Sequence, residues 1–291
     1  MYPSQLPSAR FSTSRQTLLV PQDCSANPLG RRTAASANRH RELLDNLQRF
    51  RAQSYLQDGA IHPSEVTADG RHEQPADRES WHLLTHNDEG ELVACARYHP
   101  LKNPSFPATT AARSPLAHSS LWRRKLQTAV EHSIEAAAAR RASFAELGGW
   151  CVAPQARHTP VALHSVLYMF ALGEVLGGTI GLSTATRRHA SASILQRLGA
   201  RQIALPCGEI LPAYFDPRFN CDMELLVFDS LRPAPRYAAK IAALRDHIET
   251  QIPVLAPDSP SPTTSTLANL LHSLQSEGSS PFDWSPAGQG A

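Results

Sequence analysis

One carboxylate introduces an otherwise apolar run in the middle of the chain. Glu146 is followed by Leu147–Val152, a short apolar stretch that predicts a central β-strand. A carboxylate buried in such a strand is costly unless it is paired or takes part in chemistry. Glu146 is therefore our candidate functional carboxylate. The alternative is an ordinary carboxylate at the surface of a sheet.

An arginine stands just before the longest apolar segment, which starts at Val161 and predicts a helix. The first turn of a helix carries free N–H groups and the positive end of the helix dipole. A cation beside it is unfavourable unless an anion lies between the two. Arg157 therefore indicates an anion-binding loop. Pro160 in this loop removes one N–H donor, but it suits the first position of the helix.

Three further charged residues lie upstream. Arg51 lies in a segment whose leucines follow helical spacing, and Asp77 lies in a charged segment. Arg97 ends an apolar strand just before Pro100. Each of the three is either a site residue or an ordinary solvated surface charge. The residue pattern alone leaves both interpretations open.

Hydrophobic spacing predicts the elements that position these residues. We expect helices and strands in the order helix 39–58, hairpin 81–85 and 91–98, helix 117–140, strand 145–152, helix from 161, strand 179–186, helix 189–198, strands 201–205 and 223–229, and helix 235–250. Segments 59–75 and 102–115 should be irregular. Polar composition predicts disorder over 1–36 and 253–291, which leaves one domain at 37–252.

The order of strand, loop, apolar helix, strand and helix after Ala145 resembles the coenzyme-binding half of the GNAT acyltransferase superfamily. In that family the loop before the helix holds the diphosphate of coenzyme A. Here the loop from Arg157 to Ala162 keeps the family's Arg and its final small residue, while Pro160 replaces the first Gly. The resemblance implies an α/β (α+β) fold. Its mixed, mostly antiparallel sheet would be splayed at its centre, between the 145–152 and 179–186 strands, and flanked by helices.

Upstream motifs resemble one branch of that superfamily, the acyl-homoserine lactone synthases and N-acyl amino acid synthases. The helix 47–56 carries their Arg-x-Arg-x-x-x-aromatic run, and an acidic segment, a hairpin and a strand-end Arg follow in the same order. The resemblance covers roughly residues 40 to 230. It implies that Glu146 is the catalytic base, and that the acceptor amine is bound by Arg51, Asp77, Arg97 and Trp150.

The resemblance also implies the donor, an acyl thioester of phosphopantetheine carried by acyl carrier protein or coenzyme A. It would be held by Cys151, Val152, Arg157, His158 and Ala162. Acyl carrier protein presents no adenosine diphosphate, so the proline in the loop favours it as partner. Two positions depart from the family. Leu195 replaces a Tyr general acid, and Gly149 replaces the Arg of the lactone synthases, which favours simple amide formation.

The best interpretation is therefore transfer of a fatty acyl group to the amine of an amino acid or similar small metabolite. Two alternatives stay open: a coenzyme-A-dependent acetyltransferase with an unusual loop, and a non-catalytic GNAT-like domain that binds a thioester or a partner. Pro160, Leu195 and Gly149 favour the non-catalytic domain, whereas the retention of Glu146, Arg157 and Arg97 argues against it.

Composition narrows the protein class. A net charge of +2 argues against a nucleic-acid-binding protein. The five cysteines form no C-x-x-C pair, which with the lack of a secretion signal predicts reduced thiols in a cytoplasm. The apolar stretch 161–178 is interrupted by polar residues and predicts a buried helix rather than a membrane span, although peripheral membrane contact is compatible with a fatty acyl product. No pattern of His, Cys and carboxylates predicts a metal site.

Overall fold

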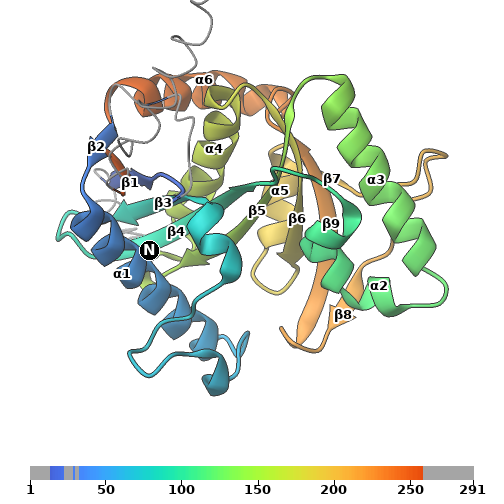
Figure 1. Cartoon of the computed structure of the whole chain (residues 1–291), viewed down its shortest axis with the longest axis horizontal. Coiled ribbons are helices and arrows are strands. Elements are labelled where there is room, and N and C mark those ends of the chain that lie inside the picture. Colours follow the sequence, from blue (N-terminus) through green and yellow to red (C-terminus); the bar gives the residue numbers. More distant parts are fainter. Residues whose placement is uncertain (1–13, 23–28, 30–32, 258–291) are drawn as a thin grey trace, which may run out of the picture. The chain divides into compact units, whose positions relative to one another are not determined.

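A ten-stranded mixed sheet forms the frame of the protein (Figure 1). The computed structural model describes residues 14–22, 29 and 33–257. A separate unit, Asp258–Ala291, lies outside the described residues, and with it most of the predicted C-terminal tail. The helices are α1 Ala37–Gln57, α2 Pro115–His118, α3 Arg123–Ala139, α4 Pro160–Val175, α5 Ser191–Arg197 and α6 Pro235–Thr250. The strands are β1 Arg15–Leu19, β2 Thr33–Ala35, β3 Trp81–His86, β4 Leu92–Pro100, β5 Ser143–Val152, β6 Thr179–Thr186, β7 Arg201–Gln202, β8 Tyr214–Asp216, β9 Cys221–Asp229 and β10 Val254–Ala256.

The sheet opens at its centre. Its strand order is β2-β10-β1-β3-β4-β5-β6-β9-β7, with β8 beside β9. β5 and β6 run parallel, but they pair only over Ser143–Glu146 and Thr179–Leu182. Beyond that point β5 continues against β4 and β6 continues against β9. The remaining pairs are antiparallel except β1–β10 and β10–β2. The expected fold class, a mixed and mostly antiparallel sheet splayed between these two strands, is confirmed.

A β-bulge interrupts β5 where it leaves β6. Cys95 pairs with Cys151 and Arg97 pairs with Gly148, so Ala96 alone faces two residues of β5, Gly149 and Trp150. Gly149 has a φ of +55°, a conformation that favours glycine. Bulges of this kind increase strand twist and redirect side chains.

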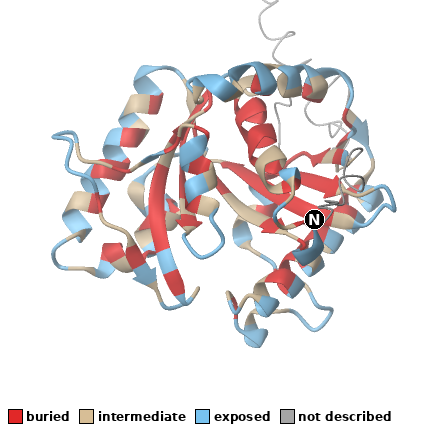
Figure 2. Ribbon diagram, turned by 180° about the vertical axis from the view of Figure 1, so that it is seen from behind, coloured by how far each residue is buried: buried red, intermediate tan, exposed pale blue. Residues whose placement is uncertain are grey.

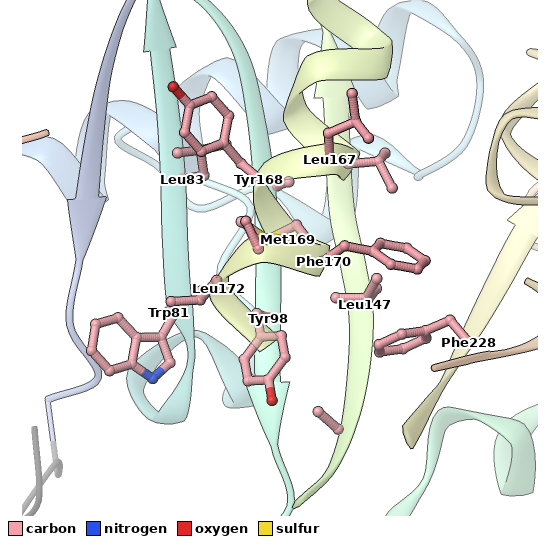
Figure 3. Packing of buried hydrophobic residues seen from close by; sticks show 14 of the residues in the cluster. Trp81, Leu83, Tyr98, Leu147, Leu167, Tyr168, Met169, Phe170, Leu172 and Phe228 are labelled. Carbon is pink, nitrogen blue, oxygen red and sulfur yellow. The ribbon is translucent and has the colours of Figure 1, made fainter. Parts of the chain in front are cut away.

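Helix α4 fills one face of the sheet. Pro160 occupies its first turn and the Thr159 hydroxyl caps it by accepting from the Val161 N–H. The helix is buried along most of its length, between the strands and α6 (Figure 2). Its side chains pack with those of β3, β4, β5 and β9 in one core, which includes Trp81, Leu83, Tyr98, Leu147, Leu167, Phe170 and Phe228 (Figure 3). The prediction of a buried helix is confirmed, and no helix among the described residues is long and apolar enough to span a membrane.

Helices α1 and α3 cover the opposite face. Phe144 packs with α3 while its neighbour Ala145 packs in the α4 core, so alternate residues of β5 point to opposite faces. Glu146 and Gly148 share the side of Phe144. Between the two helices, the segment that contains the 3₁₀ turns η4 (Phe106–Ala108) and η5 (Thr110–Arg113) crosses the sheet on this side (Figure 1).

Several predicted boundaries need correction. The segment predicted to be disordered at 1–36 contains strand β1, whose Leu18 and Leu19 are buried, and strand β2. The segment 253–291 contains β10, which pairs with both of them. These strands are short and their partners are distant in sequence, so local pattern misses them. The helix predicted at 117–140 is broken after His118, where Ser119 accepts from the Trp122 N–H.

Candidate active site

A buried ion pair joins α1 to the segment before β3. Arg51 and Asp77 have side chains that are 0 % and 1 % exposed. The guanidinium donates from Nη1 to Asp77 Oδ1 at 3.0 Å and from Nη2 to Oδ2 at 2.5 Å, a two-pronged pairing. Nη2 also donates to the His72 carbonyl at 2.5 Å. Asp77 lies in the first turn of η3 (Pro75–Glu79), and its carboxylate reaches back to the backbone N–H of Gln74, just before the turn.

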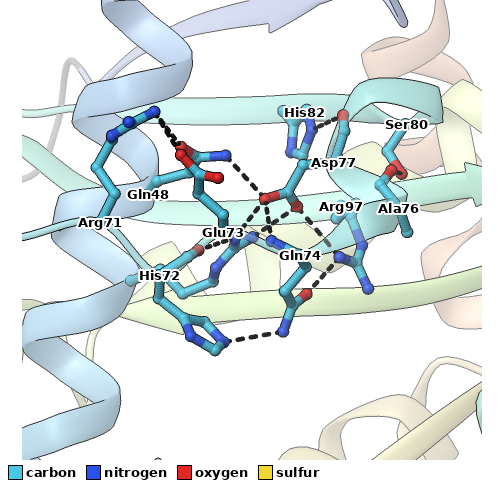
Figure 4. Close-up of polar contacts among 12 residues, drawn as sticks. Gln48, Arg71, His72, Glu73, Gln74, Ala76, Asp77, Ser80, His82 and Arg97 are labelled. Carbon is cyan, nitrogen blue, oxygen red and sulfur yellow. Dashed lines mark hydrogen bonds and ion pairs between the residues drawn. The ribbon is translucent and has the colours of Figure 1, made fainter. Parts of the chain in front are cut away.

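Arg97 of β4 is the second cation of this cluster (Figure 4). Its Nη1 donates to Asp77 Oδ1 at 3.2 Å and to the Gln74 side-chain oxygen. Oδ2 of Asp77 also accepts from Gln48 Nε2 at 3.0 Å and from the Gln74 backbone N–H at 3.1 Å. One carboxylate thus faces two guanidinium groups, which leaves one positive charge to be balanced by another group.

The arginines around Asp77 keep its carboxylate ionised. Burial alone would raise the pKa of Asp77, but the hydrogen bonds and charge of Arg51, with smaller contributions from His82 and Arg97, hold that pKa well below its usual range. Burial lowers the pKa of His82 to about 4, so this histidine is neutral at neutral pH. His82 Nε2 lies 2.8 Å from the Asp77 carbonyl.

Two glycines make room for the guanidinium groups over β5. A Cβ atom on Gly148 would meet only Arg97 Nη2, at 3.5 Å. A Cβ atom on Gly149 would lie 3.1 Å from Arg97 Cβ and 3.6 Å from Arg51 Nη1. The backbone at Gly149 is thus covered by two arginines from other elements.

Glu146 faces the same side as Arg97. It lies across from His99, and Gly148 lies across from Arg97, so the Glu146 and Arg97 side chains are diagonal neighbours in the sheet. The Glu146 carboxylate is buried, and its Oε1 accepts from the Thr110 N–H at 2.6 Å and the Thr110 hydroxyl at 2.8 Å. Its Oε2 has no hydrogen-bond partner among the described residues.

Most of the unsatisfied buried side-chain nitrogens in the described residues, all except Trp150 Nε1, lie on this face. Within the described parts of the chain, five buried side-chain nitrogens lack a hydrogen-bond partner: Arg51 Nε, His82 Nδ1, Arg97 Nε, His99 Nδ1 and Trp150 Nε1. All five belong to α1, β3, β4 and β5. The two guanidinium atoms, Arg51 Nε and Arg97 Nε, are N–H donors on the face of Glu146. Buried donors without acceptors are rare in folded proteins, so this pair indicates a place for an acceptor group of a ligand.

The predicted donor loop lies at the other end of β5. Arg157 Nη2 donates to both carboxylate oxygens of Asp58, at 3.1 Å and 2.9 Å, and its Nε to the Val152 carbonyl at 3.4 Å. The anion beside the helix start is therefore a carboxylate of the chain itself, from the end of α1. His158 has a φ of +64°, an uncommon conformation for a residue with a side chain.

The remaining predicted site residues fall into two places. Cys151 is a buried free cysteine that lies across from Cys95 in the neighbouring strand, beside α1. Val152 ends β5, and Ala162 lies in the first turn of α4. Trp150 packs against the α4 core, away from the arginine cluster. The structure thus brings together Arg51, Asp77, Arg97 and Glu146 on one face, and it places Trp150 on the other.

Sequence reasoning missed four contributors: Gln48, Gln74, His99 and Thr110. The capping-box spacing of Gln74 and Asp77 was a usable signal, because the side chain three residues into a turn reaches back to the turn's first N–H. The other three carried no such signal. No group of three or more His, Cys, Asp or Glu side chains in the described residues could hold a metal ion.

No protein-family model and no curated protein sequence matches the chain. Similar solved structures include BjaI, a CoA-dependent acyl-homoserine lactone synthase, with a TM-score of 0.48 and 15 % identity over 89 % of this chain and 100 % of BjaI. FeeM, an N-acyl amino acid synthase from uncultured soil microbes, has a TM-score of 0.41 and 14 % identity over 76 % of this chain and 93 % of FeeM. An acetyltransferase of the GNAT family from Staphylococcus aureus Mu50 has a TM-score of 0.38 and 12 % identity over 65 % of this chain and 94 % of its own. These proteins represent the groups that the sequence motifs resemble.

Proposed function

We propose that the protein is an N-acyltransferase that moves an acyl group from a thioester to the amine of an amino acid or similar small metabolite. The observation that carries the proposal is the diagonal pair of Glu146 and Arg97 over the bare backbone of Gly148. An amino acid offers a carboxylate to a guanidinium and an ammonium to a carboxylate, so it complements both charges of this pair. It also supplies the negative charge that two arginines around one aspartate leave unbalanced.

The thioester fits the splay. Among the described residues, the edge of β5 from Leu147 onward has no partner strand on the side of β6. Apart from the Val152 carbonyl, which accepts from Arg157 Nε, backbone groups on this edge are therefore able to bind an extended chain. The amide groups of a pantetheine arm are suited to this edge as an added strand. The orphaned Nε1–H of Trp150 provides one further donor in this part of β5. Backbone amides near Cys151 and Val152 would stabilise the oxyanion that forms when the thioester is attacked.

Proton transfer is the task of Glu146. The acceptor amine is an ammonium at neutral pH and becomes a nucleophile only after it loses a proton to the carboxylate. The amine nitrogen then attacks the thioester carbonyl carbon and the C–S bond breaks. Of the two protons that the nitrogen gives up in becoming an amide, one leaves on the donor thiol and the other is released to water. Thr110 fixes one oxygen of Glu146, which leaves Oε2 to receive the proton.

The loop before α4 favours acyl carrier protein over coenzyme A as donor. Pro160 offers no N–H, and the charge of Arg157 is already paired with Asp58, so the site has little left to bind a diphosphate. Changing Pro160 to Gly should restore one amide donor and tighten coenzyme A binding by about 1 kcal/mol in calorimetry. Tight binding of coenzyme A by the unchanged protein would contradict this preference.

The proposed function is tested by product analysis. The purified protein is incubated with an acyl carrier protein or coenzyme A thioester and a mixture of amino acids, and N-acyl products are identified by mass spectrometry. An N-acyl amino acid that disappears in the Glu146→Gln variant supports the proposal. An acetylated product made only from acetyl-coenzyme A would favour the acetyltransferase alternative. Thioester binding without any product would favour a binding domain.

A further inference from the structure

His99 lies directly across the strand pair from Glu146. The two residues are register partners in β4 and β5, so their side chains project from the same face of the sheet. Side chains of such partners have Cβ atoms about 5 Å apart. The imidazole therefore borders the carboxylate that we assign as the base.

The imidazole of His99 is buried and only partly satisfied. His99 is 9 % exposed, and its Nδ1 lacks a hydrogen-bond partner among the described residues. Three charged groups act on it: Arg97 on its own strand, Glu146 on β5 and Glu79 at the end of η3. Burial and the charge of Arg97 lower the pKa of His99, and the two carboxylates oppose them without reversing the shift. At neutral pH the ring is therefore neutral and able to take up a proton.

We propose that His99 and Glu146 form a two-residue proton relay, in which His99 receives the proton that Glu146 removes from the acceptor ammonium. This rests on the proposed function. The ammonium loses one proton to the carboxylate, the carboxylate passes it to the imidazole and regains its negative charge, and the resulting imidazolium is paired with that charge. When the C–S bond breaks, the imidazolium returns this proton through Glu146 to the departing thiolate. The nitrogen gives up its second proton to water as the neutral amide forms, so one turnover converts an ammonium and a thioester into an amide, a thiol and one released proton.

A proton relay accounts for a buried imidazole at the position across from Glu146. An imidazole is the side chain whose proton affinity is best matched to neutral pH, which is where general-base catalysis is most effective. Thr110 donates two hydrogen bonds to Glu146 Oε1, and His99 lies across from Glu146 on the neighbouring strand, so the carboxylate lies between a hydrogen-bond donor and a proton acceptor. His99 does not touch the substrate and is therefore a positioning residue.

The relay is tested by the pH dependence of amide formation in His99→Gln. The variant should keep its KM for the amine, lose about 10²-fold in kcat, and lose the acid limb of the kcat profile that the imidazole gives the unchanged protein below pH 6.5. His40→Gln is the matched control, since His40 is also a buried histidine but its Nε2 lies 2.8 Å from the Val20 carbonyl, beside β1. The pH profile of this variant should be unchanged. An unaltered profile in His99→Gln, with Glu146→Gln inactive, would overturn the relay and leave the acyltransferase function standing.

A second measurement needs no substrate. The titration of the His99 ring, followed by NMR, should show a pKa below 6.5 that falls further in Glu146→Gln, because the carboxylate charge that favours the imidazolium has been removed. The same His99 pKa in both proteins would overturn the relay even if no acyl product were ever found. Absence of product together with a coupled titration would instead count against the proposed function alone.

Discussion

At the scale of single residues, the site depends on charges held where water cannot reach them. Asp77 shows this most clearly, because five hydrogen bonds from Arg51, Arg97, Gln48 and Gln74 converge on its two oxygens. A buried carboxylate with this many donors is stable only while every partner is present. Glu146 differs from Asp77, because only its Oε1 accepts hydrogen bonds from the described residues. We therefore expect Oε2 to be the atom that receives a proton.

Glu146→Gln tests the base directly. The variant keeps the size of the side chain and an oxygen that can accept from Thr110, but it cannot bind a proton. Turnover near neutral pH should fall by about 10²- to 10⁴-fold and recover in part at high pH, where free amine is abundant. Steady-state rates across the pH range measure this. Glu224→Gln is a matched control, because Glu224 is an equally buried strand carboxylate bound to Arg187. Wild-type rates in Glu146→Gln would remove this residue from the mechanism.

Asp77→Asn should destabilise the fold by about 3–5 kcal/mol, because it leaves two buried guanidinium groups without a counter-charge. The pKa of Asp77 is lowered in the folded state, so its stabilising contribution is present at neutral pH and is lost as the pH falls below about 4, the unfolded value. The unfolding free energy of the variant should therefore depend less on pH in the acid range. Urea titrations at several pH values check this. Asp69→Asn, at an exposed ion pair, should change little, and an equal loss there would contradict the argument.

At the scale of secondary-structure elements, the bulge in β5 sets the position of the arginines. Gly149→Ala adds a Cβ atom 3.1 Å from Arg97 Cβ at a φ of +55°, so it combines backbone strain with a clash. We expect a loss of about 1–2 kcal/mol in stability and a raised KM for the acceptor as Arg97 shifts. Gly59→Ala shares the positive φ but has nothing within 4 Å, and it should cost stability without affecting KM. Equal effects of both variants on KM would disprove the role of the bulge.

Local pattern predicted most elements well and the environment of the site poorly. Strand β6 and helix α6 have the predicted bounds, because each is bounded by clear turn signals and has a strong period. The partners of Glu146 could not be found in this way. Thr110 lies 36 residues away in an irregular segment, and His99 becomes its neighbour only through strand register. The ion pair of Arg157 with Asp58 joins residues 99 positions apart, so no sequence window contains both.

At the scale of the whole molecule, the sheet determines where the chain can be shortened. A protein ending at residue 257 keeps β10 and should unfold at the same urea concentration as the full chain. A protein ending at residue 252, the boundary that composition predicted, loses the pairing of β10 with β1 and β2 and the buried Val254, and should be markedly less stable. Urea unfolding of the two truncated proteins measures the difference. Equal stability would show that β10 does not contribute to the fold.

The placement of β10 between β1 and β2 also constrains how the protein is made. The ribosome synthesises β1 among the first of the described residues and β10 among the last, so the two strands of this parallel pair are separated by the synthesis of almost the whole described chain. Until then β1 has a partner on one side only, β3, and presents an open edge to other nascent chains. The margin of the sheet farthest from the splay is therefore completed last. An elongating chain can pass through a stage in which the strands that carry Arg97 and Glu146 are already made while the edge at β1 is still unpaired.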